Sequence, residues 1–502
     1  MASSTTAPLA PSLRLVFLKR FELGQSVTRA CRGVLGCAVG AWVLLAQAQQ
    51  AANVPQGMDG GTTLGLAKAY SHALEQDATV RAARAQAAGM AERLTQAKAQ
   101  LYPNISLNAS RYANDLSRTQ PNLLGQTTTT QENYFSYSQT LQLRQPLYRP
   151  ALGLGVDVAR AQGRDANAAL EREVQGMGVR VVEAYLQVLL SQEKESLLTA
   201  QEQLAVQQLA AAQKRFAGGQ GIRTDIDEAQ ARIDLLVAQR LEASQTRQGA
   251  LLQLQMLTQQ PVSGVHALLP QALDMAGFAA QTPQFWMERA EANSPEVQSA
   301  LARLEAARLD VKRAEASHKP TLDAIVQLSR SGSESVTSIQ SSYTNRQVGL
   351  QFNLPLYAGG GIQSAVRQAL AEQTRQEEVL ESVRRDLGLR VQREWRGVTE
   401  GVLRAHAMAR AVESADKVVV SVKRSYEGGL RTVLDVLNAE QQAQQARRDL
   451  GEARLLYVAS RMRLLALAGE LDAQAVQGAD GWFCASDCGT MQSSSSEVQI
   501  SR

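Results

Sequence analysis

An internal repeat is the sequence feature that most restricts the fold of this chain. Four short landmarks occur twice in the same order, with about 210 residues between the two copies. They lie at residues 101–105 and 318–322, 145–148 and 354–357, 215–219 and 425–429, and 225–229 and 435–439. The third landmark places Phe216 and Tyr426 just before paired glycines. We therefore expect two copies of one structural unit, repeat 1 over residues 49–260 and repeat 2 over residues 261–470.

Each repeat contains a very long stretch without proline. Residues 151–217 and 362–427 predict helices of roughly 100 Å, at 1.5 Å per residue. Within the second stretch, apolar residues step alternately by four and three positions, a seven-residue spacing typical of coiled-coil packing; they include Val391, Trp395, Val398, Val402 and Ala405. Gly218 and Gly219, and likewise Gly428 and Gly429, predict turns at the helix tips. Return helices are expected at 225–257 and 435–467. A further helix is expected before each strand pair, at 63–100 and 283–317, where the composition favours helix.

Upstream of each long helix, polar and apolar residues alternate with a period of two, which predicts strands. The expected strands cover residues 104–112, 134–145, 321–330 and 346–354. Each is about ten residues long, which suits a transmembrane β-strand. Polar loops are expected between them, at 114–132 and 331–345, and long polar loops on one side are typical of outer-membrane barrels. A small soluble sheet is the alternative interpretation of the same pattern.

Four strands are too few to close a barrel, and an open sheet edge in lipid would leave backbone groups unpaired. The chain must therefore oligomerise if these strands span a membrane. Two chains give a barrel whose interior side chains fill, whereas three or more leave a passage. The expected fold is thus an α+β membrane protein. Its long coiled-coil helices form an α-barrel continuous with a transmembrane β-barrel, with four strands per chain, which would make twelve strands if three chains combine.

The two ends of the chain differ in composition from the repeats. Residues 1–48 combine a basic start, an apolar run over 33–46 and an Ala46-Gln47-Ala48 cleavage site, which predicts a secretory signal peptide. Without this segment the formal net charge is zero, so no nucleic-acid partner is expected. Residues 471–502 are expected to be a disordered tail. Within it, Cys484 and Cys488 form either a local disulfide or two free thiols.

No pattern in the sequence indicates an enzyme. The four histidines are scattered without metal-ligand spacing, and Gly359-Gly360-Gly361 lacks the Lys-Ser/Thr of a phosphate loop. Neither a metal nor another cofactor is expected. A periplasmic coiled-coil adaptor, which also has long heptad helices, is the rival of another class. Two helix pairs and paired ten-residue strands speak against it.

The residues from about 62 to 470 resemble the TolC family of outer-membrane efflux and secretion ducts. The resemblance is most specific at residues 354–360 (LPLYAGG) and 426–439 (YEGGLRTVLDVLNA). It implies a homotrimer in outer-membrane lipid with a long periplasmic extension. It also implies partnership with a periplasmic adaptor protein and an inner-membrane transporter. The function so implied is export through a tripartite pump, most readily type I protein secretion, with small-molecule efflux as the alternative.

The same resemblance implies a gate at the helix tips. Thr224 and Asp225 match the family's acceptors of polar links, and Tyr426 and Arg431 match the donors. Asp435 matches a first acidic ring, whereas Asn438 stands where a second ring would require an acid. A purely local interpretation competes. Asp225 would favour a helix N-terminus, and Thr432 with Asp435 fits a capping box. Both interpretations can hold for one residue.

Overall fold

The computed structural model describes residues 62–121, 125–219, 221–273, 275–335 and 341–484. The expected signal peptide at 1–48 lies outside the described residues. Cys488 also lies outside the described residues, and so does the expected alternative of a disulfide between Cys484 and Cys488.

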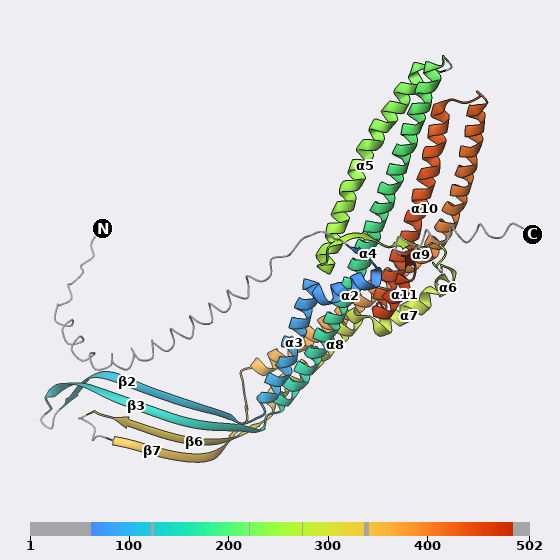
Figure 1. Ribbon diagram of the computed structural model, residues 1–502. Coiled ribbons are helices and arrows are strands. Elements are labelled where there is room, and N and C mark those ends of the chain that lie inside the picture. Colours follow the sequence, from blue (N-terminus) through green and yellow to red (C-terminus); the bar gives the residue numbers. More distant parts are fainter. Residues whose placement is uncertain (1–61, 122–124, 220, 274, 336–340, 485–502) are drawn as a thin grey trace, which may run out of the picture. The chain divides into compact units, whose positions relative to one another are not determined.

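A four-stranded antiparallel sheet carries the expected alternation, in the order β2-β3-β6-β7 (Figure 1). Its strands are β2 (Asn104–Pro121), β3 (Thr127–Tyr148), β6 (Thr321–Ser333) and β7 (Ser341–Asn353). The prediction of loops at 114–132 and 331–345 is wrong for most of these residues. The β2–β3 ladder continues without interruption to Pro121 opposite Thr127. Threonine is β-branched and favours strands, and pairing satisfies the backbone groups that a loop would leave to water.

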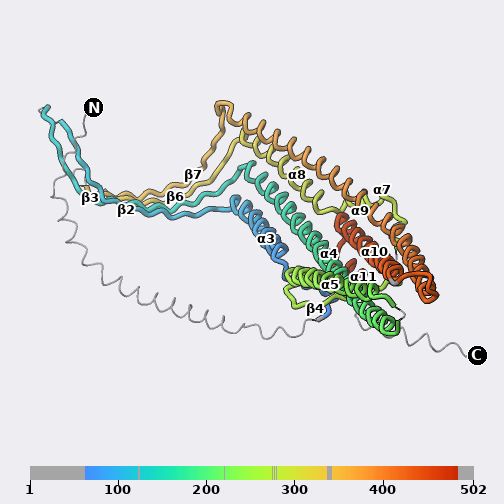
Figure 2. The backbone as a smooth tube through the Cα atoms, turned by 90° about the horizontal axis from the view of Figure 1, so that it is seen from above, coloured from blue at the N-terminus to red at the C-terminus, as the bar shows by residue number. Residues whose placement is uncertain are grey.

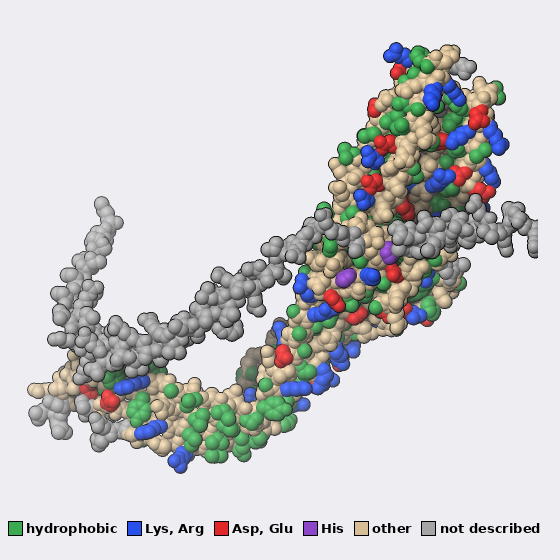
Figure 3. Space-filling view, in the orientation of Figure 1, with side chains coloured by type: hydrophobic (Ala, Val, Ile, Leu, Met, Phe, Trp, Pro, Cys, Tyr) green, Lys and Arg blue, Asp and Glu red, His purple; other side chains and the backbone are tan. Residues whose placement is uncertain are grey.

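The register separates the sheet into two chemically different faces, because residues directly opposite each other share a face. Leu107, Leu141 and Leu328 form one row across three strands, and Asn108, Thr140 and Ser329 form the next row on the other face. The apolar face is open, with Val348 82% exposed and Phe352 64% exposed. Hydrophobic side chains accordingly gather over the sheet in Figure 3.

Four long helices dominate the rest of the chain. They are α4 (Pro150–Ala217), α5 (Arg223–Thr258), α9 (Gly361–Glu427) and α10 (Val433–Leu467). Figure 2 shows α4 and α9 running on from the strands of the sheet. Pro150 starts α4 directly after β3, at a position where its missing N–H would be unpaired in any case. Helix α4 packs along α5, and α9 packs along α10. Contacts between α4 and α10 join the two pairs.

A broken helix precedes the sheet hairpin in each repeat. Repeat 1 has α2 (Leu66–Gln76) and α3 (Ala78–Ala99), and repeat 2 has α7 (Pro283–Asn293) and α8 (Pro295–Glu315). In repeat 1 the Asp77 carboxylate accepts hydrogen bonds from the backbone N–H groups of Thr79 and Val80, which starts a new helix. In repeat 2 the residue before Pro295 is kept out of the helical region. A single continuous helix over 63–100 or 283–317 is therefore wrong.

The helices follow a side-by-side order in which the helices of repeat 1 are followed by those of repeat 2. Helix α8 contacts both α4 and α9, while α3 contacts α4, which gives the order α3-α4-α8-α9 on the side of the sheet. Towards the glycine turns the order is α5-α4-α10-α9. Helix α9 thus lies at one edge throughout. The other edge is formed by α3 on the side of the sheet and by α5 towards the glycine turns.

The expectation of a disordered tail after residue 470 is wrong for residues 471–484. Helix α11 (Ala473–Asp480) packs against α2, and β8 (Phe483–Cys484) pairs with β5 (Ala267–Leu268). Leu471 and Val476 are fully buried, which repays the ordering of this segment. The Tyr70 hydroxyl donates a hydrogen bond of 3.4 Å to the Leu471 carbonyl.

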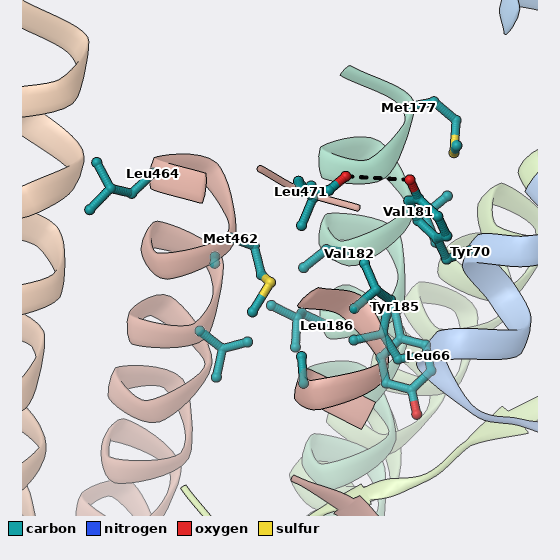
Figure 4. Close-up of a cluster of buried hydrophobic side chains, with 14 of the residues drawn as sticks. Leu66, Tyr70, Met177, Val181, Val182, Tyr185, Leu186, Met462, Leu464 and Leu471 are labelled. Carbon is teal, nitrogen blue, oxygen red and sulfur yellow. Dashed lines mark hydrogen bonds between the residues drawn. The ribbon is translucent and has the colours of Figure 1, made fainter. Parts of the chain in front are cut away.

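This segment completes the largest hydrophobic core of the described chain. Figure 4 shows Tyr70 and Leu66 of α2, Val181 and Tyr185 of α4, and Met462 of α10 around Leu471. Short strands β1 (Thr62–Leu64) and β4 (Val262–Val265) pair in parallel beside it, joining the two repeats. The remaining short elements are α6 (Ala276–Ala279) and the 3₁₀ turn Ala316–His318. Of the helices that the structure describes, none combines the length and apolar character needed to cross a bilayer.

Trp482 provides a test of this C-terminal packing. Its side chain is 9% exposed, and the Arg461 guanidinium lies 4.5 Å from its ring centroid and 4.3 Å from that of Phe278. Trp482→Ala should cost about 3 kcal/mol of stability, because it leaves a cavity and removes a cation–π contact. Thermal unfolding of the detergent-solubilised protein followed by circular dichroism measures the loss. Leu430→Ala, at a residue 84% exposed, is the control. Equal midpoints for both variants would contradict the packing.

Candidate functional site

The two helix tips contain the residues that the sequence singles out. At the first tip, Gly218 and Gly219 end α4, and Gly219 has a φ of +72° that favours glycine. A Cβ at Gly221 would lie 2.9 Å from the backbone nitrogen of Phe216, so this turn excludes larger residues. Thr224 and Asp225 follow in the first turn of α5. Asp225 therefore lies where a helix dipole favours an acid, as the local interpretation predicts.

The second tip repeats this geometry with different side chains. Gly428 ends α9, Gly429 has a φ of +75°, and the Leu430 N–H donates to the Ser425 carbonyl over 2.9 Å. The predicted capping box is confirmed at the start of α10. The Asp435 carboxylate accepts from the Thr432 backbone N–H at 3.0 Å, and the Thr432 hydroxyl accepts from the Asp435 N–H at 3.2 Å. Asn438 is exposed one turn later.

Asp435 is held in its charged form. The backbone N–H of Thr432, its hydroxyl and then the Arg431 guanidinium lower the pKa of this carboxyl below its usual range. Arg431 lies 3.6 Å from the Asp435 carboxylate, as an i,i+4 pair on the same helix start. Within this chain Arg431 thus lies beside Asp435, the predicted ring residue. Asp435 caps α10 and at the same time places a negative charge at the tip.

Tyr426 has a partner that the sequence did not predict. Its hydroxyl accepts a hydrogen bond from Arg215, whose guanidinium also lies 4.7 Å from the centre of the Tyr426 ring. This contact joins the end of α4 to the end of α9. Among the described residues of one chain, neither Tyr426 nor Arg431 bonds to Asp225. The signal for Arg215 was present in the repeat, because Arg215 takes the place that Ser425 has in the second copy.

Glu440 makes a second link between the helix pairs. Its carboxylate lies 2.7 Å from the Lys423 ammonium of α9 and accepts a hydrogen bond of 3.1 Å from the Gln208 side chain of α4. Its side chain is only 12% exposed, so water screens this contact poorly. Glu440 falls outside the matched sequence landmarks, and only the packing of α4 on α10 reveals it.

A cavity lies beside this link. Its volume is about 250 Å³, and it is lined by residues of α4, α5 and α10. Gln208, Arg232 and Glu440 line it together with apolar residues that include Leu236. The two helix pairs therefore meet through polar contacts near their tips, in contrast to the apolar core around Leu471. In the described part of the chain, no cluster of His, Cys, Asp or Glu is suited to hold a metal ion.

Comparison with known proteins identifies the class to which this arrangement belongs. The family model "Outer membrane efflux protein" matches residues 69–259 and 286–470. Those two segments correspond to the two repeats, and the chain belongs to this family of outer-membrane proteins. Membership of this family argues against the alternative class, a periplasmic coiled-coil adaptor.

Curated relatives cover most of the chain. The proteases secretion protein PrtF of Dickeya chrysanthemi is 29% identical over 432 residues, which is 85% of this chain and 93% of PrtF. The alkaline protease secretion protein AprF of Pseudomonas aeruginosa is 30% identical, over 82% of this chain and 85% of AprF. The outer membrane protein TolC of Escherichia coli is 25% identical over 82% of this chain and 83% of TolC.

Solved structures agree on the fold. The outer membrane protein VceC from Vibrio cholerae matches with a TM-score of 0.67 at 18% identity, over 81% of this chain and 97% of VceC. The MtrE outer membrane channel of Neisseria gonorrhoeae matches with a TM-score of 0.64 at 18% identity, over 81% of this chain and 90% of MtrE. At this identity the likeness concerns the fold alone.

Asp435→Asn tests the capping box. The amide is a weaker acceptor than the carboxylate for the Thr432 N–H and loses the ion pair with Arg431, so the first turn of α10 should fray. Amide hydrogen exchange over residues 432–438 should accelerate severalfold at neutral pH. Because the folded pKa is lowered, the capping contribution is present above the usual carboxyl range. It should disappear in the wild type as pH falls through the folded pKa.

Asn438→Asp is the matched control, since Asn438 is exposed and lies outside the box. Exchange in this segment should stay as in the wild type. Equal exchange in Asp435→Asn and the wild type at neutral pH would contradict the role of Asp435 as a cap.

Proposed function

We propose that three copies of this chain close into one duct through the outer membrane, and that the duct conducts cargo out of the cell without chemistry of its own. The observation that carries this proposal is the matching order of strands and helices. The sheet has β2 at one edge and β7 at the other. The helices that adjoin these strands, α3 and α9, are also the edges of the helical layer.

Matching edges of this kind favour a closed ring. Strand β2 and helices α3 and α5 of one chain would meet β7 and α9 of the next, which is a heterologous contact that closes by rotation. Three chains would then contribute twelve strands and leave a passage. The exposed apolar face with Val348, Leu350 and Phe352 would face lipid, and the rows of serine, threonine, asparagine and glutamine would line the passage.

The glycine tips would form the inner end of this duct. In the closed ring, α9 of one chain lies beside α5 of its neighbour, which brings Tyr426 and Arg431 towards Thr224 and Asp225 across the subunit boundary. The polar lock expected from the sequence is therefore a contact between chains. Within each chain, Arg215 already holds Tyr426 at the tip. Asp435 would supply the acidic ring, and Asn438 would leave the second ring position uncharged.

Secreted polypeptides are the cargo that the relatives favour. Both PrtF and AprF carry the secretion of proteases in their names and match over more than four fifths of this chain. Type I secretion requires an inner-membrane transporter and a periplasmic adaptor as partners. Small-molecule efflux is the second candidate, because the family as a whole is described as efflux proteins.

Loss of the gene should test the cargo. In a deletion strain, a type I substrate should remain inside the cells and disappear from the medium, and the wild-type gene on a plasmid should restore it. Susceptibility to dyes and detergents, measured in the same strains, examines the efflux alternative. Normal secretion combined with raised susceptibility would contradict polypeptide export. A purified protein that is not trimeric by native mass spectrometry would contradict the closed ring.

Simultaneous Tyr426→Phe and Arg431→Ala substitutions test the gate. Because they remove the donors of the proposed lock, single-channel conductance in planar bilayers should rise severalfold. Arg223→Ala is the control, since Arg223 is an exposed basic residue at the start of α5. Conductance that stays unchanged in the double variant would eliminate the lock. An equal rise in Arg223→Ala would point to a general effect of charge at the tip.

A further inference from the structure

An ionic cluster lies where the sheet meets the long helices. Asp323 of β6 accepts hydrogen bonds from Arg149 at 2.7 and 2.5 Å, one to each carboxylate oxygen. Arg144 of β3 donates to the same carboxylate at 3.1 and 2.6 Å. The Asp323 side chain is only 3% exposed, whereas those of Arg144 and Arg149 are 44% and 28% exposed. One buried acid thus holds two partly exposed cations.

The strand register assigns this cluster to the polar face. Asn104 lies opposite Arg144, and the next row on that face contains Ser106, Gln142 and Gln327. Asp323 itself lies opposite Gln351 of β7. Further along the face come rows of serine, threonine and asparagine. From residue 138 to the inner end of the sheet, the described strands therefore carry charge on this face only at Arg144 and Asp323, to which Arg149 adds from the helix start.

The cluster has an excess of positive charge. Two guanidinium groups share one carboxylate, so each chain keeps a net charge of +1 at this level. The carboxylate is covered, and the solvent-exposed part of the cluster is the arginine part. A structural pin between β6 and the start of α4 would need only one arginine. Arg149 makes that contact through both carboxylate oxygens, and Arg144 is additional to it.

We propose that Arg144 and Arg149, held by Asp323, form an electropositive collar around the inner end of the β-barrel and attract anions into it. The proposal rests on the proposed function, because it requires the polar face to line the duct. In a trimer the collar carries three net positive charges in one ring. Its field acts on mobile anions and on acidic groups of passing cargo, and it weakens as salt shortens the screening length.

Ion selectivity of the complete trimer in planar bilayers tests the collar, with a potassium chloride gradient as the probe. Arg144→Gln leaves Arg149 to hold Asp323 and removes the net charge. The chloride-to-potassium permeability ratio should then fall about twofold at 10 mM salt, and hardly change at 1 M. Asp323→Asn raises the net charge and should shift the ratio in the opposite direction. A merely structural contact would not produce shifts of opposite sign.

Arg330→Gln is the matched control. Arg330 lies on the same strand as Asp323 but on the opposite face of the sheet, opposite Gln139 and Thr344, and it is exposed. Its loss should leave the permeability ratio unchanged. An unchanged ratio in Arg144→Gln, or an equal shift in Arg330→Gln, would overturn the collar. If Asp323→Asn does not assemble, the comparison of these two arginine variants still decides. A wild-type protein that forms no channel would instead refute the proposed function.

Discussion

The backbone groups at the two free edges of the sheet are the constraint on which the rest of the structure depends. Strands β2 and β7 each present a row of N–H and C=O groups with no partner strand inside the described chain. In lipid such groups would have no water to bond, and in the proposed duct each edge meets the edge of a neighbouring copy. The edges of the helical layer match those of the sheet. Helices α3 and α5 lie at the edge that corresponds to β2, and α9 lies at the edge that corresponds to β7. One rotation can therefore complete both layers at once.

The two ends of the long helix pairs are held by different physics. Where α5 and α10 end, α2, α4, α10 and the segment 471–484 enclose a dry hydrophobic core around Leu471. Near the glycine tips, polar contacts join the pairs: Arg215 bonds to Tyr426, and Gln208 bonds to Glu440. Lys423 also contacts Glu440, from within the same pair. A dry core fixes one arrangement, because any displacement opens cavities. Polar contacts beside a cavity can exchange for contacts with water or with another chain at a smaller cost. A fixed core and adaptable tips suit a duct that opens at one end.

Charged residues are concentrated at two levels, one on the polar face of the sheet and one at the helix tips. The polar face of the described sheet is largely uncharged from the loops to the end that adjoins the helices. Arg144, Arg149 and Asp323 lie together at that end. Asp435 places a negative charge at the opposite end, where a helix start already requires an acid for capping. A passing ion or polypeptide would thus meet charge at two levels, of opposite sign, separated by the length of the helices.

The sequence by itself determined the repeat, the positions of the long helices, the alternating faces of the strands and the glycine turns. These features depend on local periodicity and on residues such as Pro150 and Gly429, whose backbone preferences act without distant partners. It missed the order in the segment 471–484, because that segment is short and gains its stability from burial against α2 and α4. It also missed the breaks at Asp77 and Ser294 and extended the loops too far into the strands. Only the tertiary structure decided that Tyr426 meets Arg215, that Glu440 bridges two helix pairs, and that one buried Asp323 holds two arginines. Each of these contacts joins residues far apart in the chain, and sequence spacing carries no information about such distances.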